Sequence, residues 1–130
     1  MKTKIKVDEI IDMEHINTSI SIKLGNTKDS LEFVKQIQPF IRERMPLRIS
    51  VQKRLVGSAD VLIEMGMNSN YKYGRQILIR DAFNIGYNGA GARGLMTFFE
   101  IFGADSSELR PLVLQSNEQL ENKRLVVEIL

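Results

Sequence analysis

The sequence contains no cysteine, so it has neither a disulfide framework nor thiolate ligands for zinc. A single histidine, His15, leaves one position for a His-rich metal site or a Ser-His-Asp arrangement. No apolar stretch approaches the roughly 20 residues that span a bilayer. The amino terminus, MKTKIKVDEI, lacks the apolar region of a secretory signal. From these absences we expect a cytoplasmic protein without a membrane partner.

Catalytic signatures are also missing. There is no cysteine nucleophile and no G-x-S-x-G elbow, and no residue visibly orients His15. A hydrolase with two paired carboxylates stays open, because a sequence does not show which acids face each other across a cleft. We expect no cofactor, and an enzyme is not the favoured interpretation.

The chain has 130 residues, about the length of one domain. Five segments alternate between apolar and polar residues, as strands with one buried face do. In the first of them, lysines alternate with Thr3, Ile5 and Val7, and lysine commonly protects an exposed sheet edge. The predicted strands are residues 2–7, 19–24, 47–52, 59–65 and 125–130. We predict a single α+β domain over residues 1–130.

Two segments have helical spacing. One starts at Asn26 or Thr27, both good N-cap residues, and continues to Ile41. The other, residues 92–102, is apolar nearly all round, which is typical of a helix buried on more than one side. The order strand, helix, strand, strand, helix, strand matches a split βαβ (ferredoxin-like) core of mostly antiparallel sheet with two main helices. Extra strands are predicted at residues 2–7, 76–80 and 111–115.

A glycine-rich loop comes directly before the second predicted helix. Four of the nine glycines fall in residues 86–94. Successive N–H groups in such a loop can converge on one anion, and a helix N-terminus adds donors and partial positive charge. An arginine can add a bidentate contact with phosphate or carboxylate, and Tyr87 and Asn88 can stack on or hydrogen-bond a ring. The predicted ligand-binding residues are Gly86, Tyr87, Asn88, Gly89, Gly91, Arg93 and Gly94.

Two known motifs come near this loop, and neither is complete. Gly89, Gly91 and Gly94 match G-x-G-x-x-G, but the dinucleotide fingerprint needs an apolar strand running straight into the first glycine. Residues 81–88 do not form such a pattern. The P-loop spacing from Gly86 to Gly91 leads into Ala-Arg instead of Lys-Ser/Thr. The alternative is that these glycines are architectural and allow a buried helix to pack closely against the sheet.

A second candidate site is a set of basic residues with aromatic neighbours. Arginines bind phosphates and aromatic rings stack on unpaired bases, so the set is a candidate surface for single-stranded nucleic acid. The net charge of only +2 favours a solvated face paired with acidic residues instead. The residues are Arg42, Arg44, Arg48, Lys53, Arg54, Lys72 and Arg75.

A third candidate lies near the amino terminus. If this stretch is helical, Asp8, Asp12 and His15 share one face and offer ligands to a divalent metal. The alternative is an acidic surface turn with Ile10, Ile11 and Ile16 packed inward. That alternative is favoured, and no metal site is predicted.

The preferred interpretation is a non-enzymatic binding protein that holds a small phosphorylated or anionic ligand, such as a nucleotide, at the glycine-rich loop. One alternative is an interaction or assembly subunit that forms homo-oligomers, or binds a protein partner, through edge strands. Leu62, Val126 and Leu130 are apolar on faces that should be polar, so they are predicted to bury either at such an interface or beneath another element of the chain. The second alternative is a domain that binds single-stranded nucleic acid.

Overall fold

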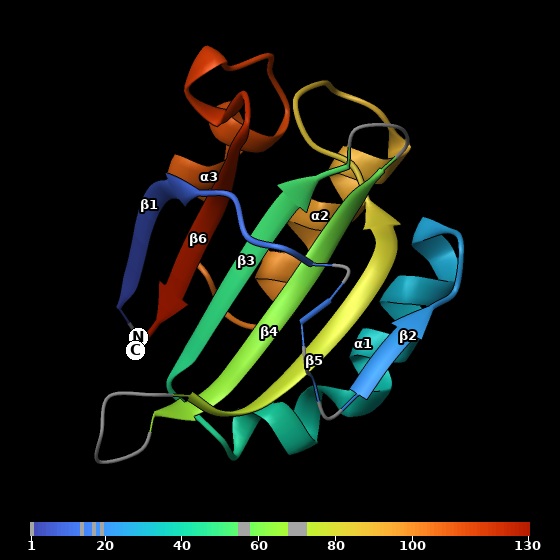
Figure 1. Ribbon diagram of the computed structural model, residues 1–130, viewed down its shortest axis with the longest axis vertical. Helices are drawn as coiled ribbons and strands as arrows, with labels where there is room; N and C mark the ends of the chain where they lie inside the picture. The colour runs from blue at the N-terminus through green and yellow to red at the C-terminus, as the bar shows by residue number, and fades with distance from the viewer. Residues whose placement is uncertain (1, 14, 17, 19, 55–57, 68–72) are drawn as a thin grey trace.

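The computed structural model describes residues 2–13, 15, 16, 18, 20–54, 58–67 and 73–130. Within them, six strands form one sheet with the order β1-β6-β3-β4-β5-β2 (Figure 1). The strands are β1 (Thr3–Glu9), β2 (Ile20–Lys23), β3 (Leu47–Lys53), β4 (Ala59–Met67), β5 (Tyr73–Phe83) and β6 (Lys123–Ile129). The helices are α1 (Thr27–Arg42), α2 (Ala90–Ile101) and α3 (Ser106–Val113), with a 3-10 helix η1 at Glu118–Leu120. The predicted α+β class is confirmed.

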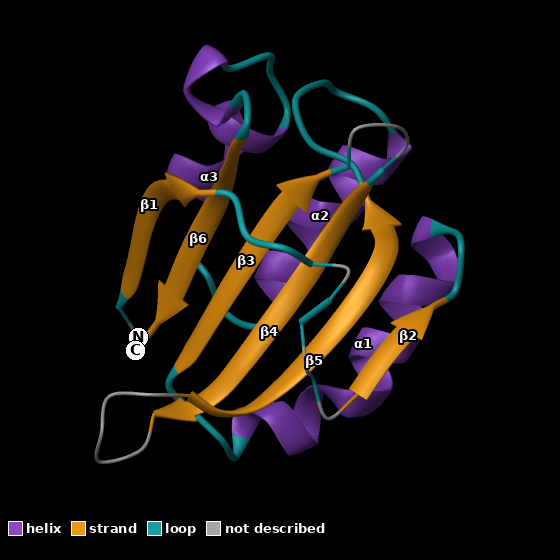
Figure 2. Ribbon diagram, in the orientation of Figure 1, coloured by secondary structure: helices purple, strands orange, loops and turns teal. Residues whose placement is uncertain are grey.

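The sheet is mostly antiparallel, as predicted, and among the described strand pairs only β2 and β5 run parallel. The five segments predicted from alternation coincide with β1, β2, β3, β4 and β6 to within two residues at either end. All three helices lie on the same side of the sheet, behind it in the view of Figure 2. No helix of the described part of the chain is long and apolar enough to cross a membrane.

The ferredoxin-like plan is not confirmed. That plan places two strands between its two main helices, whereas three strands, β3, β4 and β5, lie between α1 and α2. Strand β5 has 11 residues and lies inside the sheet between β4 and β2, and the predicted strand at residues 76–80 is its centre. Before this centre, Tyr73, Gly74 and Arg75 show no apolar alternation, so their strand structure depends on pairing with β4 and not on a local apolar pattern. After it, the register of the pairing shifts, and Ala82 and Phe83 are buried in the core.

The predicted strand at residues 111–115 is wrong, because these residues end α3 and form the turn after it. The Asp105 side chain caps this helix by accepting a hydrogen bond from the Ser107 backbone N–H at 3.0 Å. Leu109 and Val113, four residues apart, are both fully buried on one stripe of the helix. The cap and the buried stripe together favour a helix over a strand.

The main core lies between the sheet and the helices. The predicted start of α1 is confirmed: the Asn26 side chain accepts a hydrogen bond from the Asp29 backbone N–H at 2.8 Å. Helix α2 contributes Phe98, whose ring lies 5.1 to 5.5 Å, centroid to centroid, from those of three other phenylalanines. Such tilted and edge-to-face contacts add to the stabilisation from burial.

The opposite face of the sheet is crossed by the residues between β1 and β2 (Figure 1). We call residues 10–13, with His15 and Ile16, the crossing segment. Met13 is buried against Leu62 of β4 and Leu78 of β5, and Ile11 and Ile16 pack on the same cluster. The prediction that Leu62 is buried beneath another element of its own chain is therefore confirmed.

Gln52 of β3 fixes the crossing segment to the sheet. Its side-chain oxygen accepts a hydrogen bond from the Ile11 N–H at 2.9 Å, and its side-chain nitrogen donates one to the Ile11 carbonyl at 2.8 Å. Ile10, by contrast, is 55% exposed, so the prediction that it packs inward is wrong. It turns outward because Ile11 and Met13 occupy the inward positions.

The Met13→Ala variant tests whether this segment is part of the folded core. We expect the free energy of unfolding to fall by about 2–5 kcal/mol, since the change removes a buried side chain and leaves a cavity. Ile10→Ala is the matched control and should change stability by less than about 0.5 kcal/mol, because Ile10 is largely exposed. Urea unfolding followed by circular dichroism gives both values. Equal effects of the two changes would contradict this assignment.

Candidate functional site

The glycine-rich loop connects β5 to α2. Gly86 has a φ of +97°, which favours glycine, and its N–H donates a hydrogen bond to the Val113 carbonyl at 2.8 Å. This bond ties the loop to the end of α3. Gly89 is the N-cap residue of α2. Because glycine has no side chain, it offers no side-chain acceptor to the first backbone N–H groups of the helix.

Three of the loop glycines allow close packing within the chain. A Cβ atom on Gly89 would overlap the Tyr87 ring, and one on Gly94 would overlap the Thr27 methyl group at the start of α1. A Cβ on Gly91 would lie 2.9 Å from the Asn84 Cβ and 3.2 Å from its backbone nitrogen. The geometry of these glycines therefore supports the architectural interpretation.

The exposed polar side chains of the loop bind one another. Arg93 donates from one guanidinium nitrogen to the Asn88 side-chain oxygen at 3.1 Å and to the Asn88 carbonyl at 3.4 Å. Tyr87 is exposed beside them and covers Gly89. Arg93 is thus engaged in holding the loop closed, and a ligand that used its guanidinium would replace these contacts.

The basic residues predicted as a nucleic-acid surface lie at two different ends of β3. Arg42 and Arg44 come at the end of α1, just before β3 begins, whereas Lys53 and Arg54 lie where β3 ends. A seven-residue strand separates the two groups by roughly 20 Å. Lys72 lies outside the described residues.

Several of these basic side chains are held by neighbours in the fold. The Arg44 guanidinium lies 3.5 Å from the centre of the Phe40 ring, and Arg48 makes two hydrogen bonds of 2.9 Å to the Glu64 carboxylate. Arg75 is exposed near the start of β5. The structure therefore does not bring the predicted set together as one surface.

The proposed metal ligands are not brought together either. Asp8 belongs to strand β1, where it lies 3.6 Å from Lys6 and from Arg124, so the helical arrangement is wrong. Asp12 and His15 form a separate pair, with His15 Nδ1 2.7 Å from the Asp12 carboxylate. Among the described residues there is no group of three or more potential ligands suited to a metal ion.

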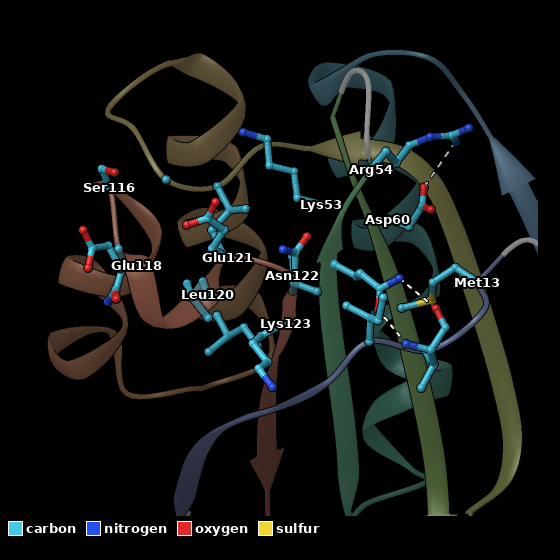
Figure 3. Close-up of a pocket in the computed structure, with 18 of the residues that line it drawn as sticks. Met13, Lys53, Arg54, Asp60, Ser116, Glu118, Leu120, Glu121, Asn122 and Lys123 are labelled. Carbon is cyan, nitrogen blue, oxygen red and sulfur yellow. Dashed lines mark hydrogen bonds and ion pairs between the residues drawn. The ribbon is translucent and has the colours of Figure 1, made fainter.

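An open pocket of about 870 Å³ lies at the end of the sheet where β3 finishes and β6 begins (Figure 3). Five parts of the chain line it: the crossing segment, the end of β3, Asp60 of β4, the glycine loop through Gly86, and the stretch from Ser116 to Leu125 around η1 and the start of β6. Its apolar lining includes Ile11, Val51, Ile85, Leu120 and Leu125. The sequence patterns singled out Gly86, Lys53 and Arg54 as candidate ligand or nucleic-acid contacts and Asp12 as a candidate metal ligand, and the remaining walls come from segments without a recognisable motif.

The charged groups of the pocket differ in how they are paired. Arg54 lies 3.5 Å from the carboxylate of Asp60, which is buried in the wall, and Lys123 lies 2.6 Å from Glu9 outside the pocket. Lys53 is exposed and makes no ion pair with another described residue. Figure 3 shows its side chain extending away from β3, apart from the Arg54–Asp60 pair. Lys53 is therefore the cation of this pocket best placed to meet a ligand.

A bulge in β5 supports the Asp60 side of the pocket. The pairing of β4 with β5 shifts between Ala59 and Val61, and Asp81 adopts a φ of +56°, which is uncommon for a residue other than glycine. The Asp81 N–H donates to the Asp60 carboxylate at 2.8 Å, and the Ser58 hydroxyl donates to the Asp81 carboxylate. The bulge thus fixes Asp60, which in turn positions Arg54.

The pKa of Asp81 is lowered from its ordinary value of 3.8, mainly because the Ser58 hydroxyl donates to its carboxylate. Desolvation opposes this effect, while the Ser58 backbone N–H and the charges of Lys23 and Arg54 reinforce it. The folded state therefore stabilises the ionised form of Asp81.

Comparisons of the chain with protein-family models, with curated proteins and with solved structures found no match. The geometry of the pocket and of the sheet is therefore the basis for assigning a function.

The Gly91→Ala variant tests the packing role of the loop. We expect the free energy of unfolding to fall by about 1–2 kcal/mol, because overpacking against Asn84 costs about 1–3 kcal/mol and the gain in helix propensity returns at most about 1 kcal/mol. Ala90→Gly, at the exposed neighbouring position, is the control for backbone entropy. A gain in stability for Gly91→Ala in thermal unfolding would contradict close packing at this glycine.

The Asp81→Asn variant tests the bulge. Asparagine also tolerates positive φ, so the change mainly removes the charge. Because the folded pKa lies below the unfolded value, the ionised carboxylate stabilises the fold at neutral pH. This contribution declines as the pH falls below about 3.8 and is lost as the pH falls through the lower folded pKa. We expect Asp81→Asn to be less stable than the parent at pH 7, with the difference shrinking steadily as the pH is lowered below about 4. Glu32→Gln on α1 serves as a control for removing a carboxylate elsewhere. If the difference in the free energy of unfolding between the parent and Asp81→Asn did not depend on pH, this role of the charge would be excluded.

Proposed function

We propose that the protein binds a small molecule with an anionic group in the pocket at the end of the sheet, with Lys53 as the receiving cation. The observation that supports this function best is the pocket itself. Its volume of about 870 Å³ falls within the roughly 300–1,000 Å³ typical of small-molecule sites. Its lining combines apolar side chains with polar and charged ones, and polar groups of this kind fix the orientation of a bound ligand.

The glycine loop contributes to this proposal in a limited way. Gly86 lines the same pocket as Lys53, so a ligand there can contact both the loop backbone and the lysine ammonium. Arg93 is not among the lining residues and is occupied by Asn88. We therefore place the anionic group of the ligand near Lys53 instead of in the turn between Gly89 and Arg93.

The walls of the pocket are anchored in the fold. Gln52 fixes Ile11 on one side, and the hydrogen bond from Gly86 to Val113 fixes the glycine loop on another. The Asp60–Arg54 pair, supported by the bulge at Asp81, forms part of a third side. Such preorganisation lowers the entropic cost of holding a ligand.

A thermal-shift screen against nucleotides, sugar phosphates and small dicarboxylates tests the proposal. A compound present at about 100 times its Kd adds about 2.7 kcal/mol to the free energy of unfolding, which raises the midpoint by several degrees. Titration calorimetry then compares hits on the parent and on Lys53→Met. We expect the Kd to rise about tenfold or more, because a charge-assisted hydrogen bond contributes about 1.5–3 kcal/mol.

Two control variants make the test specific. Lys35→Met removes an exposed lysine of α1 on the helical side of the sheet and should leave the Kd unchanged. Arg93→Ala should also bind normally, and loss of binding in that variant alone would move the site to the turn of the glycine loop. Absence of any hit, or hits that Lys53→Met binds as tightly as the parent, would refute the proposed function.

A further inference from the structure

Strand β1 forms one end of the sheet and pairs only with β6 among the described residues. The Leu130 N–H donates to the Lys2 carbonyl at 2.9 Å, so the backbone polar groups of Lys2 point toward β6. The backbone N–H and C=O groups of successive residues point alternately to the two sides of a strand, so those of Lys4 and Lys6 also point toward β6. The N–H and C=O groups of Thr3, Ile5 and Val7 consequently point outward from the sheet.

The side chains of β1 divide between two chemically different faces. Ile5 and Val7 pair with Val127 and Leu125, which belong to the core on the helical side. Ile5 packs on that core, whereas Val7 is 36% exposed. Lys4 and Lys6 project to the opposite face and are exposed.

The positive charge on this face is only partly compensated. Lys6 lies 3.6 Å from Asp8, but Asp8 lies equally close to Arg124, and Glu9 is paired with Lys123 at 2.6 Å. Within the described part of the chain, no ion pair joins Lys2 or Lys4 to an acidic group. The acidic residues of β1 are therefore paired with cations of the same chain, and Lys2 and Lys4 at the start of the strand remain available to a partner.

We propose that β1 is a docking edge for an extended segment of another protein in which apolar and acidic residues alternate. Such a segment adds to the sheet beside β1 and pairs with the outward groups of Thr3, Ile5 and Val7. Its acidic side chains lie beside Lys4 and Lys6, and its apolar side chains cover Val7 on the other face. Opposite charges on neighbouring strands stabilise such a pair.

A second copy of this chain, paired symmetrically about the centre of β1, does not fit the same edge. In an antiparallel pair of β1 strands centred on Ile5, each Lys4 lies opposite the Lys6 of the other copy. Like charges directly opposite one another are destabilising, and lysine on an edge strand is a recognised barrier to self-pairing. The edge therefore favours an acidic partner over homo-oligomers. The sheet's other edge, β2, has only four residues and offers a shorter template.

The test uses the full chain labelled with ¹⁵N and a seven-residue peptide that alternates valine and glutamate. We expect the peptide to shift the amide resonances of Thr3, Ile5 and Val7 and to protect them from exchange. A matched peptide with lysine in place of glutamate should bind at least tenfold more weakly, because each opposed charge pair becomes a like-charge pair.

Two variants separate backbone pairing from charge. Val7→Pro removes an outward N–H without removing a bond to β6, and proline is tolerated at such edge positions, so it should weaken binding with little loss of stability. The double change Lys4→Glu with Lys6→Glu should reverse the preference toward the lysine peptide, while Lys35→Glu should not. The proposal would be overturned by equal binding of both peptides or by no binding at all. Changes in amide resonances confined to residues outside β1, or a dimer of the unmodified chain formed through β1, would also overturn it.

Discussion

Strand β4 is buried on both faces, and much of the remaining structure depends on this requirement. Every residue from Ala59 to Met65 is buried, with Val61 and Ile63 toward the helices and Leu62 toward the opposite face. Without a cover on the second face, Leu62 and Leu78 would be exposed to water at a substantial free-energy cost. Met13 provides that cover, so the chain has to cross the sheet between its first and second strands.

The crossing segment also determines the direction of β2 and the position of the pocket. The chain leaves β1 at one end of the sheet and passes diagonally over β3 and β4, so β2 starts near the other end (Figure 1). Strand β2 consequently runs parallel to β5, the single exception in the sheet. The segment covers the middle of the face and becomes one wall of the pocket beyond it, where Gln52 holds it in place.

Local sequence patterns predicted most of the strands but not the plan of the sheet. Alternation identifies a strand with one buried face, and the Asn26 cap identifies the start of α1, because both signals lie within a few residues. The length of β5 was not predictable in this way, since its first residues become strand only by pairing with β4, and a register shift interrupts the alternation before Phe83 at the other end. In α3, the apolar run after Pro111 resembles a short strand, whereas the Asp105 cap and the burial of Leu109 with Val113 together show the helix.

The candidate site was predicted only in part for the same reason. Gly86 and Lys53 belong to local patterns that attract attention, whereas Ile11, Leu120 and Leu125 are ordinary apolar residues. They become walls of one pocket because segments more than 100 residues apart in sequence meet at the end of the sheet.

The pairing of β1 with β6 joins segments that are equally far apart in sequence, with Thr3 opposite Ile129. During synthesis on the ribosome, strands β3, β4 and β5 can pair with near neighbours as they emerge, but β1 has to wait for almost all the rest of the chain. Throughout that interval the lysines of β1 keep an unpaired strand soluble, so the residues that shape its outer edge in the folded protein also protect the chain from aggregation before folding is complete.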